Sequence, residues 1–400
     1  MTTLILLSQT LTERGRTQRA EIREFLESIG TADTMHISDV GFYKARMKYD
    51  PAAMMVMMKG YLAMELKWTR PKRYHGFRIL AIDGSELTLP SNTRTERFAT
   101  RTRGHADEAD MPVQCKMSGL SDCINGLILD LLIDEYDHDE REHAERLTEA
   151  IPDEDRKDAL ITFDRGYFSF RLAFHLEDLG LNYLFRLNSY ALKGFQKDMK
   201  PGDGKIIEAK MSRENLDVHR RKGKDMGTFG NRVLKARLVC IRVGNTIEFL
   251  LTNLDGNRMS RTCLKRLYHM RWDVETAFRT LKEDLKMNEY SGRRETLILQ
   301  DIYCAAWILD ITRLFVRSLG YRHKPTRKQK TGINFSNAIG MVKTKLAKAL
   351  FHPVPEERAK AARLMREEIP RYVCPIRPGR SYSRDHACKN KSRMSYRSNY

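Results

Sequence analysis

Residues 159–166 read ALITFDRG, an apolar run that stops at an acid, an arginine and a glycine. A short apolar run with such a boundary is typical of a strand buried inside a sheet. A helix is expected to follow, from Ser169 to about Leu179. Asp164 would then lie at the end of the strand, where α/β sheets commonly present functional side chains.

The residues before this strand predict more of the same sheet. Residues 77–89, FRILAIDGSELTL, indicate a strand, a turn at Asp83-Gly84 and a returning strand. Two apolar runs, 114–120 and 127–134, flank Asn125-Gly126, which is a strong hairpin signal. Residues 139–150 have the pattern of a charged helix. The order strand, hairpin, helix, strand, helix indicates a mixed α/β sheet.

After the helix that follows this strand, the pattern becomes strand-like and then helical again. Strand-like runs at 183–187, 233–243 and 246–252, with a Gly/Lys/Arg-rich loop at 213–232, predict a β-rich insertion. Helix is expected again from about Arg261. The most apolar stretch, 297–319, contains two aspartates and two arginines, which favours a buried helix over a membrane span.

Composition restricts the partners. The 400 residues carry 71 Lys plus Arg against 52 Asp plus Glu, so the formal net charge is 71 − 52 = +19, and nucleic acid is the favoured partner. Ribosomal, nucleoid and membrane-surface proteins share this property. Seven scattered cysteines without a C-x-x-C pair, and no signal-peptide pattern at the start, predict a reduced, cytoplasmic protein without structural zinc. His138 and His143 are five residues apart, which would place them on different faces of one helix and argues against a zinc site.

The two ends of the chain are open to more than one interpretation. Residues 1–75 have helical apolar clusters with basic residues between them, which fit a small DNA-binding region or, better on these residues alone, ordinary core helices. Residues 371–400 carry eight Lys or Arg against one acid, and we expect this tail to touch a polyanion.

Asp83 and Asp164 form the first candidate site. Either acid alone could equally cap a helix or anchor a turn. Two carboxylates at adjacent strand ends repel each other unless a cation lies between them, and this favours a metal site.

A third acid belongs to a helix with a distinctive charged face. At about 100° per residue, Tyr268, Arg271, Glu275 and Lys282 fall within about 60° of one another, beside an apolar stripe. The alternative is a solvated face with ordinary ion pairs. Trp272 points toward the charged face rather than the stripe.

Asp83, Asp164 and Glu275 together suit a two-metal phosphoryl-transfer site. Magnesium fits because all three side chains offer oxygen ligands. Arg271 and Lys282 could hold adjacent phosphates, and Tyr268 could hydrogen-bond another.

These residues resemble the DDE transposases of bacterial insertion sequences, specifically the IS-four group with its Y-x2-R-x3-E-x6-K signature. The match is Tyr268, Arg271, Glu275 and Lys282, without a spacing error. Asp83 in AIDGS and Asp164 in FDRGY also look like this family, and the resemblance covers roughly residues 70 to 310.

The resemblance implies an RNase H-like core in two parts, 76–182 and 259–320, separated by a β-rich insertion at 183–258. The composition adds an N-terminal helical region, 1–75, as a candidate DNA-binding region, and a basic C-terminal region, 321–400, as a candidate for DNA contact or dimerisation. The resemblance also implies cut-and-paste transposition with two Mg²⁺ ions, for which Mn²⁺ substitutes. The partners would be transposon inverted-repeat ends and target DNA, bound by a homodimer at the bacterial nucleoid and not at a membrane.

Two other functions remain compatible with the fold. One is a catalytically silent DNA-binding repressor, which would not need all three acids, and the other is a nuclease that never joins strands. The chain also departs from the family in one respect, because the insertion before Tyr268 contains no tryptophan to stack near a flipped base. Either an aromatic residue such as Phe229 or Phe249 takes its place, or a hairpin intermediate is handled differently. Trp272, which points toward the charged face, is a separate candidate for DNA stacking.

Overall fold

The computed structural model describes residues 18–90, 93, 95, 97, 98, 113–212, 216, 221, 230–270, 278, 280, 281, 290–321 and 330–376. The chain divides into two compact units. Unit 1 comprises Met1–Tyr61, Glu86–Cys115 and Phe278–Tyr400, and unit 2 comprises Leu62–Ser85 and Lys116–Ala277.

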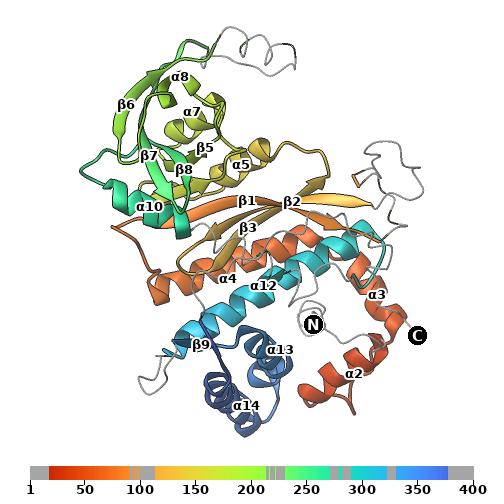
Figure 1. The fold of residues 1–400 in the computed structure, drawn as a ribbon. Coiled ribbons are helices and arrows are strands. Elements are labelled where there is room, and N and C mark those ends of the chain that lie inside the picture. Colours follow the sequence, from red (N-terminus) through yellow and green to blue (C-terminus); the bar gives the residue numbers. More distant parts are fainter. Residues whose placement is uncertain are drawn as a thin grey trace. The chain divides into compact units, whose positions relative to one another are not determined.

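Unit 2 is built on a sheet of eight strands among the described residues, in the order β3-β2-β1-β4-β5-β8-β7-β6 (Figure 1). The strands are β1 (Arg78–Thr88), β2 (Gln114–Asp122), β3 (Leu127–Glu135), β4 (Ala159–Phe163), β5 (Asn182–Leu187), β6 (Gly204–Ala209), β7 (Leu234–Val243) and β8 (Thr246–Thr252). The accompanying helices are α5 (Glu140–Glu149), α6 (Asp153–Arg156), α7 (Phe170–Asp178), α8 (Lys193–Gln196) and α10 (Arg261–Met270).

The sheet is mixed, as the sequence predicted. Strand β4 pairs in parallel with both β1 and β5, whereas β5 pairs antiparallel with β8, β8 with β7, and β7 with β6. The first five strands therefore lie in the order 3-2-1-4-5 of an RNase H-like core. Strands β8, β7 and β6 continue this same sheet.

The main core of unit 2 lies on one face of the sheet, under α5 and α7. Successive strand residues point to opposite faces, and alternate positions of β1, β4 and β5 join α5 and α7 in one buried cluster. Among the strand members are Ile82, Ile161, Phe163, Tyr183 and Phe185. The intervening positions, which include Asp83 and Arg186, therefore face the other side.

Local sequence explains where these elements start and turn. Gly126 adopts a φ of 70° between β2 and β3, which confirms the predicted hairpin turn. Asp139 and Ser169 cap α5 and α7, each with a side-chain oxygen that accepts a backbone N–H of the first turn. Both helices were expected at these positions.

The predicted turn at Asp83-Gly84 was wrong, because β1 runs without interruption through both residues. A Cβ at Gly84 would lie 2.6 Å from Oε1 of Glu140, which also pairs with Lys116 at 3.1 Å. The glycine therefore makes room for a carboxylate from α5 instead of reversing the chain.

Unit 1 is mainly helical. Its helices are α2 (Gln18–Ser28), α3 (Asp39–Met47), the first part of α4 (Pro51–Thr69), α12 (Glu295–Ser318), α13 (Phe335–Phe351), α14 (Pro355–Glu368) and the 3₁₀ turn η3 (Ile369–Arg371). Two short strands, β9 (Thr331–Ile333) and β10 (Val373–Pro375), pair antiparallel. A small core joins α2, α3 and α4 to Cys304 of α12. The helical character expected near the N-terminus is confirmed for the described residues.

Arg46 ties the early helices of unit 1 to its later part. The side chain is 1% exposed and pairs with Asp301 at 2.9 Å. It also donates to Ser291 at 2.6 Å and to Gln300 at 3.0 Å. Gln300 in turn donates to the carbonyls of Arg46 and Tyr49. The buried charge is thus paired, and each guanidinium nitrogen has a hydrogen-bond partner, as a buried charge requires.

Helix α12 is the buried apolar helix expected at 297–319. Within the described residues, no helix has the length and apolar content needed to cross a membrane.

Candidate functional site

Asp83 lies on β1, and Asp164 directly follows β4, the strand that pairs with β1 in parallel. The pairing of β1 with β4 runs from Arg78 and Ala159 to Ala81 and Thr162. If this register continued for two more residues, it would place Asp83 beside Asp164. Neighbouring strands are about 4.8 Å apart, so such a register would bring the two carboxylates close together. Both side chains are half-buried.

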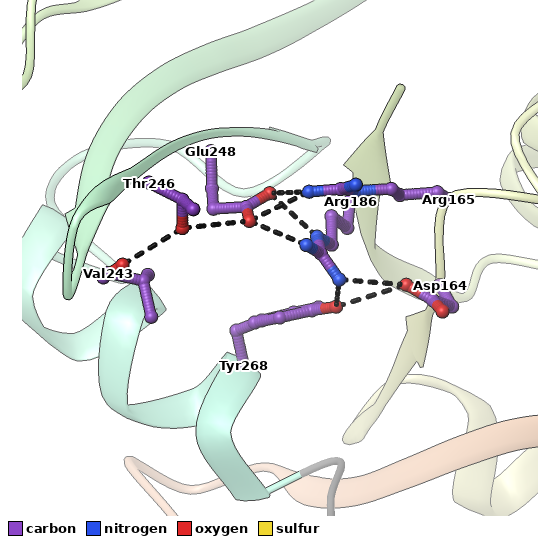
Figure 2. Close-up of polar contacts among 7 residues, drawn as sticks. All are labelled: Asp164, Arg165, Arg186, Val243, Thr246, Glu248 and Tyr268. Atoms are coloured by element: carbon purple, nitrogen blue, oxygen red, sulfur yellow. Dashed lines mark hydrogen bonds and ion pairs between the residues drawn. The ribbon is translucent and has the colours of Figure 1, made fainter. Parts of the chain in front are cut away.

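The same row continues onto the next two strands. In the parallel pairing of β4 with β5, Phe163 lies opposite Phe185, so the following residues, Asp164 and Arg186, are neighbours. Arg186 Nη1 is 3.4 Å from Asp164 Oδ1. On its other side the guanidinium binds Glu248 of β8 through two hydrogen bonds, of 2.5 and 2.7 Å (Figure 2).

Glu248 is shared by two arginines. Arg165, directly after Asp164, donates from Nη2 to both carboxylate oxygens at 2.8 Å. The Glu248 side chain is only 6% exposed. Burial alone would raise the pKa of Glu248, but the hydrogen bonds from Arg186 and Arg165 hold it below its usual value. Burial likewise disfavours the charge of Arg186, yet its hydrogen bond to Glu248 raises the pKa above the ordinary range.

Asp83 and Asp164 are the two residues of what we call the acid row. Tyr268 of α10 contacts its second member, Asp164. Its hydroxyl donates to Asp164 Oδ1 at 3.2 Å and accepts from Arg186 Nη1 at 3.3 Å. Leu264 and Leu267 of the same helix are buried, so α10 is anchored while Tyr268 contacts the acid. Figure 2 shows Asp164, Tyr268 and Arg186 converging. Two side chains from separate elements, Tyr268 and Arg186, therefore hold one oxygen of Asp164.

The other predicted site residues lie outside the described part of the chain. These are Arg271, Trp272, Glu275 and Lys282. Among the predicted residues, the structure thus brings Tyr268 to Asp164, and it places Asp83 on β1, the parallel neighbour of the strand that precedes Asp164.

Sequence reasoning missed Arg186 and Glu248. Each is a charged residue within a strand of mostly apolar residues, NYLFRL and TIEFLLT. A charge in a buried strand is rarely tolerated unless it is paired, and this was the available signal. The ion pair between them could not be predicted from the sequence, because the two residues are 62 positions apart.

The expectation that His138 and His143 lie on different faces of one helix was wrong. Helix α5 begins at Glu140, so His138 precedes it. The chain turns before the helix, and the two imidazole rings stack with centroids 4.2 Å apart.

Several known proteins resemble this chain over much of its length. Residues 74–309 match the family model described as the transposase DDE domain. The chain is 23% identical over 271 residues to transposase InsG for insertion sequence element IS4 of Escherichia coli strain K12. That alignment covers 67% of this chain and 58% of the relative, so the chain spans somewhat more than half of the relative's length. A structure of piggyBac transposase in a synaptic complex with hairpin DNA gives a TM-score of 0.41 at 13% identity, over 93% of this chain and 80% of that one.

Proposed function

This chain belongs to the transposase DDE-domain family, whose model it matches over more than half of its length, and from this premise we propose that it catalyses cut-and-paste transposition. It would cleave DNA at the inverted-repeat ends of an insertion sequence and join the freed 3′ ends to target DNA. The observation that supports the proposal is that Asp83 lies on β1 while Asp164 directly follows β4, the parallel partner of β1, and is contacted by Tyr268 and Arg186. The reaction would take place in the bacterial cytoplasm, in a synaptic complex that contains a homodimer.

The acid row suits divalent cations of the magnesium type. Asp83 and Asp164 offer only carboxylate oxygens, the ligands that Mg²⁺ prefers, and their adjacency favours a cation between them. We include Glu275, on the strength of its spacing in the sequence, as the third ligand to two Mg²⁺ ions, which Mn²⁺ can replace. When bound, such ions activate an attacking hydroxyl and stabilise the leaving oxygen of a phosphodiester.

The remaining residues would orient the acid and the DNA. Tyr268 and Arg186 hold one oxygen of Asp164, which limits the rotation of this carboxylate. In the DNA complex, we propose that the Tyr268 hydroxyl stops donating to Asp164 and donates to a phosphate oxygen instead. Arg271 and Lys282 are the proposed phosphate contacts, and Trp272 is the proposed stacking residue.

The test uses a labelled duplex carrying the DNA that flanks this gene, incubated with and without Mg²⁺. Wild-type protein is expected to cut at a repeat boundary and join the 3′ end to a second duplex. Asp83→Asn and Glu275→Ala should bind the duplex without cutting it. Glu208→Ala is the control, because its side chain is exposed on β6, and it should cut and join normally.

Two other results would replace the proposal. Cutting without joining by the wild-type protein would identify a nuclease. Binding without cutting in Mg²⁺ would identify a repressor that keeps the fold of a transposase.

A further inference from the structure

A second group of potential metal ligands lies in unit 2, where β3 ends and α5 begins. It consists of Asp134 at the end of β3, His138 in the following turn and His143 in α5. One ligand atom from each residue lies within 4.8 Å of the other two. The three side chains are therefore within reach of one cation after small adjustments.

His143 is held with one ring nitrogen toward the group. The residue is fully buried. Its Nδ1 is 2.8 Å from Oγ of Ser118, and its Nε2 is 3.1 Å from Oδ2 of Asp134. If Nδ1–H donates to Ser118, the Nε2 lone pair faces the carboxylate, an arrangement that a cation between the two atoms would satisfy. Metal-binding histidines are typically oriented by such a hydrogen bond from the second nitrogen.

His138 provides a separate observation. Its Nε2 is buried and makes no hydrogen bond. The nearby carboxylate Oε2 of Glu142 is 3.8 Å away, beyond hydrogen-bonding range. Buried polar atoms in native proteins nearly always have a partner. A metal ion between His138 and the neighbouring ligands would supply one.

We propose that Asp134, His138 and His143 bind a transition-metal ion, with Zn²⁺ the best match and Glu142 as a fourth ligand. Two imidazoles with one or two carboxylates suit Zn²⁺ and its neighbours Co²⁺ and Ni²⁺, whereas Mg²⁺ prefers oxygen ligands alone. Arg146 Nη1 is 3.1 Å from Asp134 Oδ2 and would oppose the ion. Its side chain is 52% exposed, so the guanidinium can turn toward solvent.

The proposed ion would join the start of α5 to β3, and it is independent of the cations proposed for Asp83 and Asp164. The two sites differ in donor chemistry, oxygen alone at one and mixed nitrogen and oxygen at the other. This difference lets one experiment separate them.

The experiment measures Zn²⁺ binding to the metal-free full chain by calorimetry. All proteins carry Asp83→Asn and Asp164→Asn, so that the acid row does not contribute. The parent is expected to bind one Zn²⁺ tightly, to rise in Tm with Zn²⁺, and to give the visible spectrum of nitrogen-ligated Co²⁺. His138→Gln should weaken binding at least about tenfold and abolish the Tm rise. Ser118→Ala should weaken it about tenfold, as expected for loss of an orienting partner.

His36→Gln is the matched control, because this imidazole is exposed in unit 1, and it should bind like the parent. His138 is a better target than the fully buried His143, and circular dichroism checks that the variant folds. Absence of stoichiometric Zn²⁺ binding in the parent would overturn the proposal. Equal affinity of His138→Gln and His36→Gln would do the same.

Discussion

At the scale of single residues, Glu248 matters most to the acid row, because it holds Arg186 against Asp164. We predict that Glu248→Gln lowers the free energy of unfolding by about 3 kcal/mol, since one buried charge is removed while two arginines remain. DNA cleavage should also slow, because Asp164 loses a fixed neighbour. Urea unfolding and a cleavage time course measure the two effects.

The control for Glu248→Gln is Glu208→Gln. Glu208 pairs with Lys235 on a neighbouring strand, but both side chains are more than 60% exposed. The loss of that ion pair should cost less than about 1 kcal/mol. Equal destabilisation by the two variants would show that Glu248 has no special role.

Glu177 provides a prediction about pH. Burial raises the pKa of this carboxyl above its ordinary value. The hydrogen bond from Tyr183 and the charge of Arg232 both lower the pKa, but burial outweighs them. The folded protein therefore binds the proton more tightly than the unfolded chain does. The resulting stability is fully present below the unfolded pKa, about 4.3, and is lost as the pH rises through the folded pKa.

Glu177→Gln should remove this loss of stability with rising pH. We expect the variant to lose less stability than wild type as the pH rises from about 4, as measured by urea unfolding at a series of pH values. An unchanged slope would mean that Glu177 titrates alike in the folded and unfolded chains.

At the scale of elements, the contact between α5 and β1 depends on Gly84. Gly84→Ala would place a methyl group against the Glu140 carboxylate, and we predict a loss of about 1 kcal/mol. In a Glu140→Ala background the same change should be neutral or stabilising, because alanine suits a strand better than glycine. A double-mutant cycle by chemical denaturation measures the coupling. Additive effects would contradict the packing explanation.

Gly84 also illustrates which elements the sequence could predict. Apolar runs and capping residues located β4, the β2–β3 hairpin, α5 and α7, because these signals are local. Gly84 in β1 wrongly indicated a turn. A glycine is needed there because the carboxylate of Glu140, 56 positions later in the chain, occupies the space that a Cβ would fill. Strand β6 was missed because only Ile207 and Ala209 are buried in it, so its apolar signal is weak.

The same distinction holds for the candidate site. Asp83 and Asp164 could be identified because each follows an apolar run. Arg186 and Glu248 could not be paired, because their contact depends on β8 lying next to β5, which sequence-local patterns do not encode.

At the scale of the whole molecule, the net charge of +19 predicts strongly salt-dependent DNA binding. If six to ten phosphates are contacted, the Kd should rise at least about 10³-fold between 50 and 200 mM salt. Fluorescence anisotropy with a labelled duplex, titrated at several NaCl concentrations, gives the slope. A Kd that is constant over this range would mean that phosphate contacts contribute little to binding.

The Arg46 network has a consequence for biosynthesis. Arg46 is made early, but its partners Ser291, Gln300 and Asp301 follow 245 to 255 positions later. At about 5 to 20 residues per second, a ribosome needs roughly 13 to 50 s to make that interval. During this time α3 can form, but its buried arginine has no counter-charge from α12. Unit 1 therefore contains α2 and α3, which are translated early, but its Arg46 network cannot form until after unit 2, which ends at Ala277, has been translated.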